Sequence, residues 1–171
     1  MKKVDPIDVS VSSLSQAIVF RNQARDQKKT FVLTNGCFDL LHSGHIYSLN
    51  KARELGDYLW VALNSDSSVR QLKGSSRPII GQNDRAYMLS NLSCVSGVII
   101  FDSKRLDKEI LALKPDIYVK AGDYDQSNIA REEHDALIAV KTVIEFVSFL
   151  PGRSTSACLL YTSDAADDVR G

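Results

Sequence analysis

The sequence predicts an α/β protein built around a five-stranded parallel sheet, and three features of the chain lead to that prediction. Short apolar segments alternate with segments whose apolar residues recur at helical spacing. The apolar segments are hydrophobic almost throughout, as in Tyr58–Asn64, which is typical of strands covered on both faces. Polar loops follow the strands, and the carboxyl edge of a parallel sheet is where ligands bind.

Five strands and at least six helices are expected in alternation. The strands are predicted at residues 31–34, 58–64, 98–101, 116–120 and 143–149. The helices are predicted at residues 14–27, 43–55, 66–72, 84–92, 105–113 and 127–140, with one more opening near Ser154. The polar loops after the first, second, fourth and fifth strands are expected to converge on one crevice.

Local signals set the limits of these elements. Ser13 and Gln16 form a capping-box pattern before the first helix, and Lys28–Lys29 closes it with cations suited to a helix carboxyl end. Gly56 ends the second helix. Ser65 is expected to begin one helix and Asn83 or Asp84 another, and Lys114–Pro115 is expected to end the helix before it.

Composition indicates a globular protein of one domain. The chain has 171 residues, of which 44% are hydrophobic, and its 21 basic residues balance its 21 acidic residues. This balance gives no global attraction to nucleic acid or to acidic membranes, and no apolar run is long enough to span a membrane. Three widely spaced cysteines, without a leader sequence, favour reduced thiols and a cytoplasmic location.

The last residues do not fit this pattern. The run Cys158–Asp168 resembles the translation of a sequencing-library transposon adapter in a single reading frame. We therefore expect residues 1–157 to form the domain, with its final helix cut short, and residues 158–171 to be an artefactual tail. A natural disordered tail is the alternative.

The stretch from Thr34 to His45 organises the chain. It joins the first strand to the second helix and contains His42 and His45, three residues apart at the helix start. A helix amino end offers unpaired N–H groups and a positive dipole end, which suit phosphate, and Gly36 and Gly44 allow close approach of the backbone. Zinc is the competing ligand, but the sequence offers no convincing third and fourth ligand; His134 lies in a charged helix and is expected to be solvated.

This stretch resembles the HxGH signature of the cytidylyltransferase-like nucleotidyltransferase superfamily. Further segments occur in the same order and resemble the heptose 1-phosphate adenylyltransferase module of bifunctional heptose kinase/adenylyltransferases. They are Asn64–Val69, Leu72–Gly74, Arg77–Pro78, Asp84–Ala86, Lys114–Asp116, Val119–Tyr124 and Gly152–Ser156. The resemblance spans about residues 10–157; Ala121 departs from it, since glycine is usual there.

The resemblance implies a Rossmann-like, doubly wound fold and transfer of a nucleoside monophosphate from an NTP to a sugar 1-phosphate. Its implied catalytic residues are His42, His45, Lys73 and Arg153. Its implied nucleotide-binding residues are Asn35, Gly36, Cys37, Phe38, His42, Gly44, His45, Lys120, Gly122, Asp123, Arg153, Ser154, Thr155 and Ser156. Its implied acceptor-binding residues are Asp39, Asp66, Lys73 and Arg77, and Arg85 is expected to make a structural or interface salt bridge.

The resemblance also implies cofactors and partners. Mg²⁺ is expected to arrive with the NTP, and no metal ligands are expected from the protein. ATP and heptose 1-phosphate are the expected substrates, a fused or separate sugar kinase is the expected pathway partner, and a homodimer is possible. Two other functions remain open: a glycerol 3-phosphate or related alcohol-phosphate cytidylyltransferase, and a nucleotide-binding module without turnover. Simpler roles are also open for Lys73 and Arg77 as a solvated loop, for Asp66 as a helix cap and for Asp123 as part of a turn.

Overall fold

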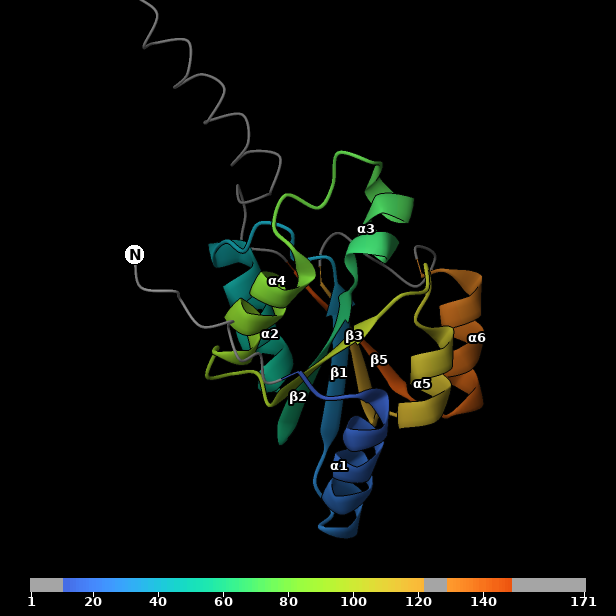
Figure 1. Cartoon of the computed structure of the whole chain (residues 1–171). Coiled ribbons are helices and arrows are strands. Elements are labelled where there is room, and N and C mark those ends of the chain that lie inside the picture. The colour runs from blue at the N-terminus through green and yellow to red at the C-terminus, as the bar shows by residue number, and fades with distance from the viewer. Residues whose placement is uncertain (1–10, 122–128, 149–171) are drawn as a thin grey trace, which may run out of the picture.

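A computed structural model describes residues 11–121 and 129–148 (Figure 1). Within these residues helices and strands alternate as expected. The helices are α1 Leu14–Asp26, α2 Ser43–Arg53, α3 Asp66–Lys73, α4 Gln82–Ser90, α5 Asp107–Leu113 and α6 Arg131–Ala139. The strands are β1 Phe31–Gly36, β2 Tyr58–Asn64, β3 Gly97–Phe101, β4 Ile117–Ala121 and β5 Val143–Val147.

The five strands form one parallel sheet in the order β3-β2-β1-β4-β5, which confirms the predicted fold class. β1 lies at the centre and pairs Phe31 with Tyr58 of β2 and Val32 with Ile117 of β4. The chain builds outward from β1 to β3 and then restarts on the other side of β1 with β4. The topological switch therefore lies between β1 and β4, where ligands bind in sheets of this kind.

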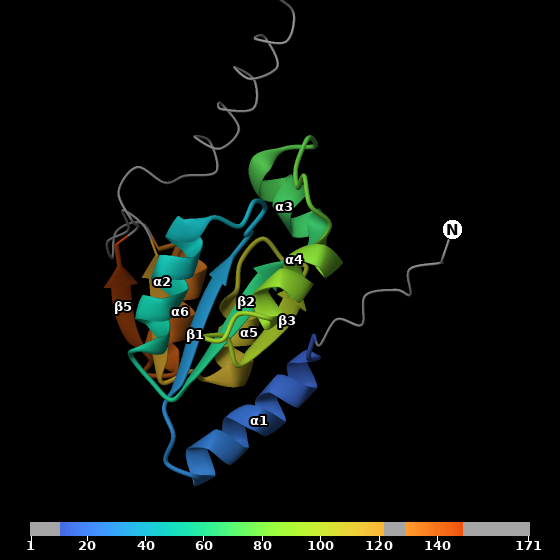
Figure 2. The same cartoon turned by 90° about the vertical axis from the view of Figure 1, so that its left-hand side faces the viewer.

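Helices cover both faces of the sheet, as Figures 1 and 2 show. On one face α1, α5 and α6 bury a cluster that includes Phe31, Leu33 and Trp60. On the other face α2 and α4 bury a cluster that includes Val32, Leu59 and Val61. Neighbouring residues of one strand enter opposite clusters, so each strand must be apolar on both sides, which explains the continuous apolar runs in the sequence.

An ion pair between Arg21 and Asp116 helps to hold the amino edge of the sheet. Arg21 of α1 donates to Asp116 at 2.6 Å, and its Nε donates to the Lys114 carbonyl at 3.0 Å. The second oxygen of Asp116 accepts the Phe31 N–H at 2.8 Å. Asp116 therefore ties α1, the start of β1 and the start of β4 together, at the edge opposite the strands' carboxyl ends.

Most element boundaries differ from the sequence prediction by one or two residues, and four elements show the differences best. α4 begins at Gln82 after Gly81, not after Asn83 or Asp84, and no side chain caps it. α5 begins at Asp107 instead of residue 105, because residues 102–106 form a loop in which the Leu106 N–H donates to Glu133. α6 covers only part of the predicted range 127–140, and β5 ends at Val147 instead of residue 149.

Two predicted features lie outside the described residues: the helix opening at Ser154 and the tail from residue 158. The capping box at Ser13 is confirmed, since Ser13 and Gln16 each accept the other's backbone N–H. No helix in residues 11–121 and 129–148 is both long and apolar enough to cross a membrane.

Candidate active site

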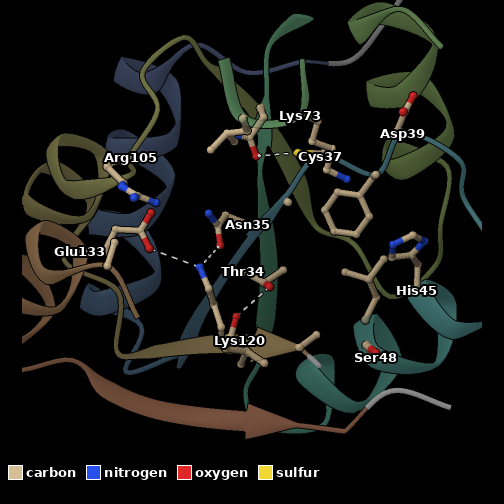
Figure 3. A pocket seen from close by; sticks show the side chains of 18 of the residues that line it. Thr34, Asn35, Cys37, Asp39, His45, Ser48, Lys73, Arg105, Lys120 and Glu133 are labelled. Atoms are coloured by element: carbon tan, nitrogen blue, oxygen red, sulfur yellow. Dashed lines mark hydrogen bonds and ion pairs between the residues drawn. The ribbon is translucent and has the colours of Figure 1, made fainter. Parts of the chain in front are cut away.

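A cavity of about 410 Å³ lies at the carboxyl edge of the sheet, where β1, β2 and β4 end (Figure 3). It is therefore at the topological switch. The eight predicted site residues that line it are Asn35, Gly36, Cys37, Phe38, Asp39, His45, Lys73 and Lys120. The loop after β3 also reaches the cavity with Lys104 and Arg105, although that loop was not expected to contribute.

His42 and His45 form a stacked pair at the start of α2. Their ring centroids are 3.9 Å apart, and the ring planes are inclined by 29°. His42 is the N-cap of α2, and its Nδ1 accepts the Gly44 N–H at 3.1 Å, so in the neutral ring the proton is on Nε2. His45 lines the cavity, whereas His42, whose ring stacks on that of His45, does not.

His45 is a neutral imidazole at pH 7. Burial, together with the smaller effects of the neighbouring His42 and Lys73, lowers the pKa of His45 to about 4. A neutral ring at this position gives the cavity an N–H donor without an added charge. A bound polyphosphate would reverse part of the effect, because its negative charge favours the imidazolium.

The turn after β1 is shaped by Gly36 and Phe38. Phe38 has φ of 45°, a left-handed conformation that is strained for a bulky side chain. A Cβ on residue 36 would lie 2.8 Å from Cε2 of Phe38, so only glycine fits there without moving the ring. The Phe38 ring in turn lies 5.2 Å from the His45 ring, measured between centroids. Because residue 36 is glycine, the Phe38 ring can lie beside the His45 ring.

Asn35 belongs to a polar network on the cavity floor. Its Oδ1 accepts from the Tyr118 hydroxyl at 2.8 Å and from Lys120 Nζ at 3.1 Å. Lys120 Nζ also donates to Oε2 of Glu133 at 3.3 Å, and Glu133 Oε1 accepts the Leu106 N–H at 3.1 Å. Since Lys120 was predicted only as a nucleotide contact, its buried ion pair with Glu133 is a structural role that the sequence did not reveal.

Asp39 is buried and holds the loop before α4. It forms an ion pair with Arg77 and accepts the Ile79 N–H at 2.6 Å. Burial alone would raise the pKa of Asp39, but the hydrogen bonds from Arg77, Ile79 and Ile80 outweigh it and lower the pKa below its ordinary value. Two of the four residues predicted to contact the acceptor are therefore engaged with each other; Asp39 lines the cavity and Arg77 does not.

Arg85 is fully buried and connects four segments around the cavity. Its guanidinium donates to the Cys37 carbonyl, to the Asn64 carbonyl at 2.9 Å and to the Ile80 carbonyl at 2.9 Å. It also forms an ion pair with Asp66 at 2.8 Å. The predicted structural salt bridge of Arg85 is confirmed. Asp66, predicted to contact the acceptor, is turned toward Arg85 and does not line the cavity.

The remaining predicted residues divide into two groups. His42, Gly44, Asp66 and Arg77 lie next to the cavity without lining it. Six residues fall outside the described part of the chain: Gly122, Asp123, Arg153, Ser154, Thr155 and Ser156.

The described residues offer neither a reactive thiol nor a cluster of metal ligands. Cys37 and Cys94 are free thiols, and burial raises the pKa of both, so neither is a ready nucleophile at pH 7. In the described residues, no group of three or more His, Cys, Asp or Glu side chains is placed to hold a metal ion. His134 is confirmed as partly exposed, with 40% of its side chain accessible, 3.9 Å from Asp135.

The sequence model of a known family, Cytidylyltransferase-like, matches residues 33–160. The chain belongs to this family. The match begins within β1 and so includes the whole stretch from Thr34 to His45 around which the cavity is built. The resemblance drawn from the HxGH residues is confirmed.

Curated relatives and a solved structure agree with this family. The chain is 46% identical over 132 residues to the Bifunctional protein HldE of Syntrophotalea carbinolica, covering 77% of this chain and 26% of the relative. It is 46% identical over 154 residues to the Bifunctional protein HldE of Citrifermentans bemidjiense, covering 90% and 30%. The chain therefore spans under a third of the length of these relatives.

The crystal structure of the lipopolysaccharide core biosynthesis protein from Thermoplasma volcanium GSS1 has the same fold. It superposes with a TM-score of 0.59 at 28% sequence identity, covering 71% of this chain and 97% of that one. Nearly all of that solved chain thus corresponds to most of the present chain.

Proposed function

We propose that this chain is a nucleotidyltransferase that moves a nucleoside monophosphate from an NTP to a sugar 1-phosphate, and that ATP and heptose 1-phosphate are its substrates. The observation that carries the proposal is the stacked histidine pair at the start of α2, with His45 lining a cavity that also receives Lys73. The relatives named bifunctional and the neighbour from lipopolysaccharide core synthesis support a sugar phosphate as acceptor.

The reaction needs no nucleophilic side chain, because the acceptor phosphate is already an anion. One of its oxygens attacks the α-phosphorus of the NTP, a new P–O bond forms, and the bond to the bridging oxygen breaks as pyrophosphate leaves. The barrier lies in bringing anions together and in stabilising charge as it moves to the pyrophosphate. Catalysis is then positioning and electrostatic stabilisation.

The cavity residues suit these tasks. Neutral His45 is proposed to donate an N–H to a phosphate oxygen and so to stabilise the charge that develops there in the transition state. Lys73, the last residue of α3, has no ion-pair partner within the described residues and supplies a point charge between the two substrates. Arg153 and Ser154–Ser156, from outside the described residues, are proposed to complete the phosphate contacts.

Mg²⁺ is proposed to enter with the NTP. The two cavity carboxylates, Asp39 and Glu133, are each engaged by a cation, namely Arg77 and Lys120. Such a donor set fits an ion held mainly by phosphate oxygens and water, which is usual for Mg²⁺. When bound, the ion would neutralise the charge of the leaving pyrophosphate.

Further parts of the proposal concern the setting of the reaction. The relatives are longer and bifunctional, and a sugar kinase, fused or separate, is proposed to supply the phosphorylated acceptor. A cytoplasmic location is proposed because nucleoside triphosphates are available there. A homodimer is proposed as a possible assembly.

A substrate panel tests the proposal. ATP, CTP and GTP are each combined with heptose 1-phosphate and with glycerol 3-phosphate, and pyrophosphate release is measured. We expect release with ATP and heptose 1-phosphate. Activity confined to CTP and glycerol 3-phosphate would favour the alcohol-phosphate alternative, and nucleotide binding without release in any combination would favour a non-catalytic module.

A variant tests the role of His45. His45→Ala is expected to lower kcat by about 10²–10³-fold, the usual effect of removing one preorganised donor to a developing charge, while ATP affinity changes little. An unchanged kcat would contradict the assigned role.

A further inference from the structure

The cavity has two chemically different ends, and only one of them is used by the phosphates in the proposed reaction. Figure 3 shows His45 and Asp39 at one end, and Arg105, Glu133, Lys120 and Asn35 at the other. The second end is formed by the loop after β3, by α6 and by the floor of β1 and β4.

Glu133 is the least expected member of this second end. Its side chain is only 5% exposed, yet it is ionisable and lines a cavity. Within residues 11–121 and 129–148, each of its oxygens has one partner, the Leu106 N–H on Oε1 and Lys120 Nζ on Oε2. Since a carboxylate oxygen can accept two hydrogen bonds, both oxygens retain acceptor capacity toward the cavity.

Donors are held beside this acceptor. Asn35 Oδ1 accepts hydrogen bonds from Tyr118 and Lys120, and these bonds fix the orientation of the amide (Figure 3). The Nδ2 group of Asn35 has no partner in residues 11–121 and 129–148, so it can donate to a ligand. Arg105 lines the cavity one residue before Leu106, whose N–H is bonded to Glu133, and no ion pair engages its guanidinium in the described residues. The end therefore presents fixed acceptors and donors side by side.

The loop that carries Arg105 is itself held in place. Ser68 of α3 donates to the Ser103 carbonyl at 2.8 Å, and the Ser103 hydroxyl donates to the Arg105 carbonyl at 2.7 Å. Together with the Leu106–Glu133 bond, these contacts fix the backbone before any ligand arrives. A preorganised polar subsite costs less to fill than one that must be ordered on binding.

Three classes of ligand can be compared at this end. A nucleobase needs a flat, mostly apolar slot, but the labelled groups here are charged or amide side chains. A phosphate could bind the Arg105 guanidinium, but it offers only acceptor oxygens, so it would leave the acceptor capacity of Glu133 unused. Hydroxyl groups both donate and accept, so adjacent hydroxyls match the alternation of Glu133 with Asn35 and Arg105.

We propose that Glu133, Asn35 and Arg105 form a subsite that binds the hydroxyl groups of a polyhydroxylated phosphate acceptor, with the acceptor's phosphate directed toward Lys73 and His45. This inference rests on the proposed function, which it deepens by assigning the residues that select the acceptor. Glu133 and Arg105 are specificity-determining residues in this proposal. An acceptor with a quaternary ammonium group is disfavoured, because it offers no hydroxyl and places its cation near Arg105 and Lys120.

Direct binding tests the subsite independently of turnover. Heptose 1-phosphate, glycerol 3-phosphate, phosphocholine and ATP are titrated separately into the full chain by isothermal titration calorimetry. We expect heptose 1-phosphate to bind most tightly of the three monoesters and phosphocholine least tightly. Equal affinity for the three monoesters would overturn the proposal.

Glu133→Gln and Arg105→Gln test the residues. Glu133→Gln keeps an oxygen for the Leu106 N–H but removes the charge. It should weaken heptose 1-phosphate binding about ten- to a hundred-fold, the usual effect of losing a hydrogen bond to a charged group, and leave ATP affinity unchanged. Arg105→Gln should act in the same direction. Because the Arg105 side chain makes no hydrogen bond or ion pair with residues 11–121 and 129–148, this variant decides the question even if Glu133→Gln does not fold. The matched controls are Glu132→Gln and Arg131→Gln, two exposed positions of α6 that should leave both affinities unchanged.

The outcomes separate the subsite from the proposed function. Pyrophosphate release by the unmodified chain, with heptose 1-phosphate affinity unaffected in Glu133→Gln and Arg105→Gln, would overturn the subsite alone. Heptose 1-phosphate affinity that depends on both residues, without any pyrophosphate release, would support the subsite and refute the proposed function. An equal loss of ATP and heptose 1-phosphate affinity in a folded Glu133→Gln would mean that Glu133 acts only as a brace, which also overturns the subsite.

Discussion

Replacing Arg85 by methionine is expected to destabilise the fold substantially. Methionine keeps much of the side chain's length and volume but removes every donor. The change leaves the carbonyls of Cys37, Asn64 and Ile80 without the guanidinium, and it leaves the Asp66 carboxylate without its cation.

The magnitude follows from the burial of these groups. Removing one partner of a buried ion pair costs about 3–5 kcal/mol. Because 29% of the Asp66 side chain is exposed while Arg85 is fully buried, water can solvate part of the orphaned carboxylate. We therefore expect a loss of about 3 kcal/mol in the free energy of unfolding and, for a chain of this size, a fall in Tm of about 6–12 °C.

The measurement is urea unfolding followed by circular dichroism, with a thermal melt in parallel. Arg70→Met is the matched control, because Arg70 is exposed on α3, and its loss should change stability by less than about 0.5 kcal/mol. A change below about 1 kcal/mol in Arg85→Met would refute the reasoning, since it would mean that the four bonds of Arg85 contribute no more than a single neutral hydrogen bond.

Three further predictions concern the turn and its two titratable groups. The pKa of His45, lowered to about 4 mainly by burial, should appear in NMR as an imidazole titration near that pH, and a titration near 6.5 would contradict the burial. The free energy of unfolding should also fall as pH drops from 6.5 toward 4, because only the unfolded chain takes up the proton in that range. Gly36→Ala should displace the Phe38 ring and lower kcat/KM for nucleotidyl transfer about tenfold or more with little change in fold, and unchanged kinetics would show that the ring position does not matter. The hydrogen bonds to Asp39, the strongest from Arg77, lower the pKa of Asp39 below 3.8, so the contribution of Asp39 to stability should be lost as pH falls below 3.8. Asp39→Asn should be less stable than the unmodified chain at pH 7 and should lose less stability on acidification. Parallel curves of stability against pH would contradict this.

The fold was largely predictable because its signals are local or periodic. β2 is apolar along almost its whole length, which by itself indicates a strand covered on both faces. The capping box at Ser13 marks the first helix by a pattern of three residues. The limits of α4 and α5 were less predictable, because Gly81 caps without a side chain and because residues 102–106 are held as a loop by Glu133, far away in the sequence.

The site divides in the same way. The turn from Asn35 to Phe38 and His45 could be predicted, since they lie in one short stretch around a strand end and a helix start. Glu133 and Arg105 could not, because neither belongs to a motif. Glu133 resembles its exposed neighbour Glu132 in sequence, and only the packing of α6 beside α5 turns one inward and the other outward.

The partners of Asp39 and Asp66 illustrate a second limit. Both carboxylates were assigned to the acceptor because the segments that contain them resemble the nucleotidyltransferase family. In the folded chain each is engaged by an arginine from the segment 77–85, so their charge is balanced within the protein. The resemblance identified the right region, but it could not show which charges were already neutralised.

The hydrogen bond from Gly44 to His42 has a consequence for the behaviour of the site in acid. The lone pair on Nδ1 of His42 accepts the Gly44 N–H and so caps α2. Because Nδ1 is an acceptor, the neutral ring carries its proton on Nε2. A second proton on that ring must occupy Nδ1 and break the bond, so the first turn of α2 loses its cap at the same moment that the histidine becomes a cation. Protonation of His42 therefore removes the side-chain cap from the helix that carries His45.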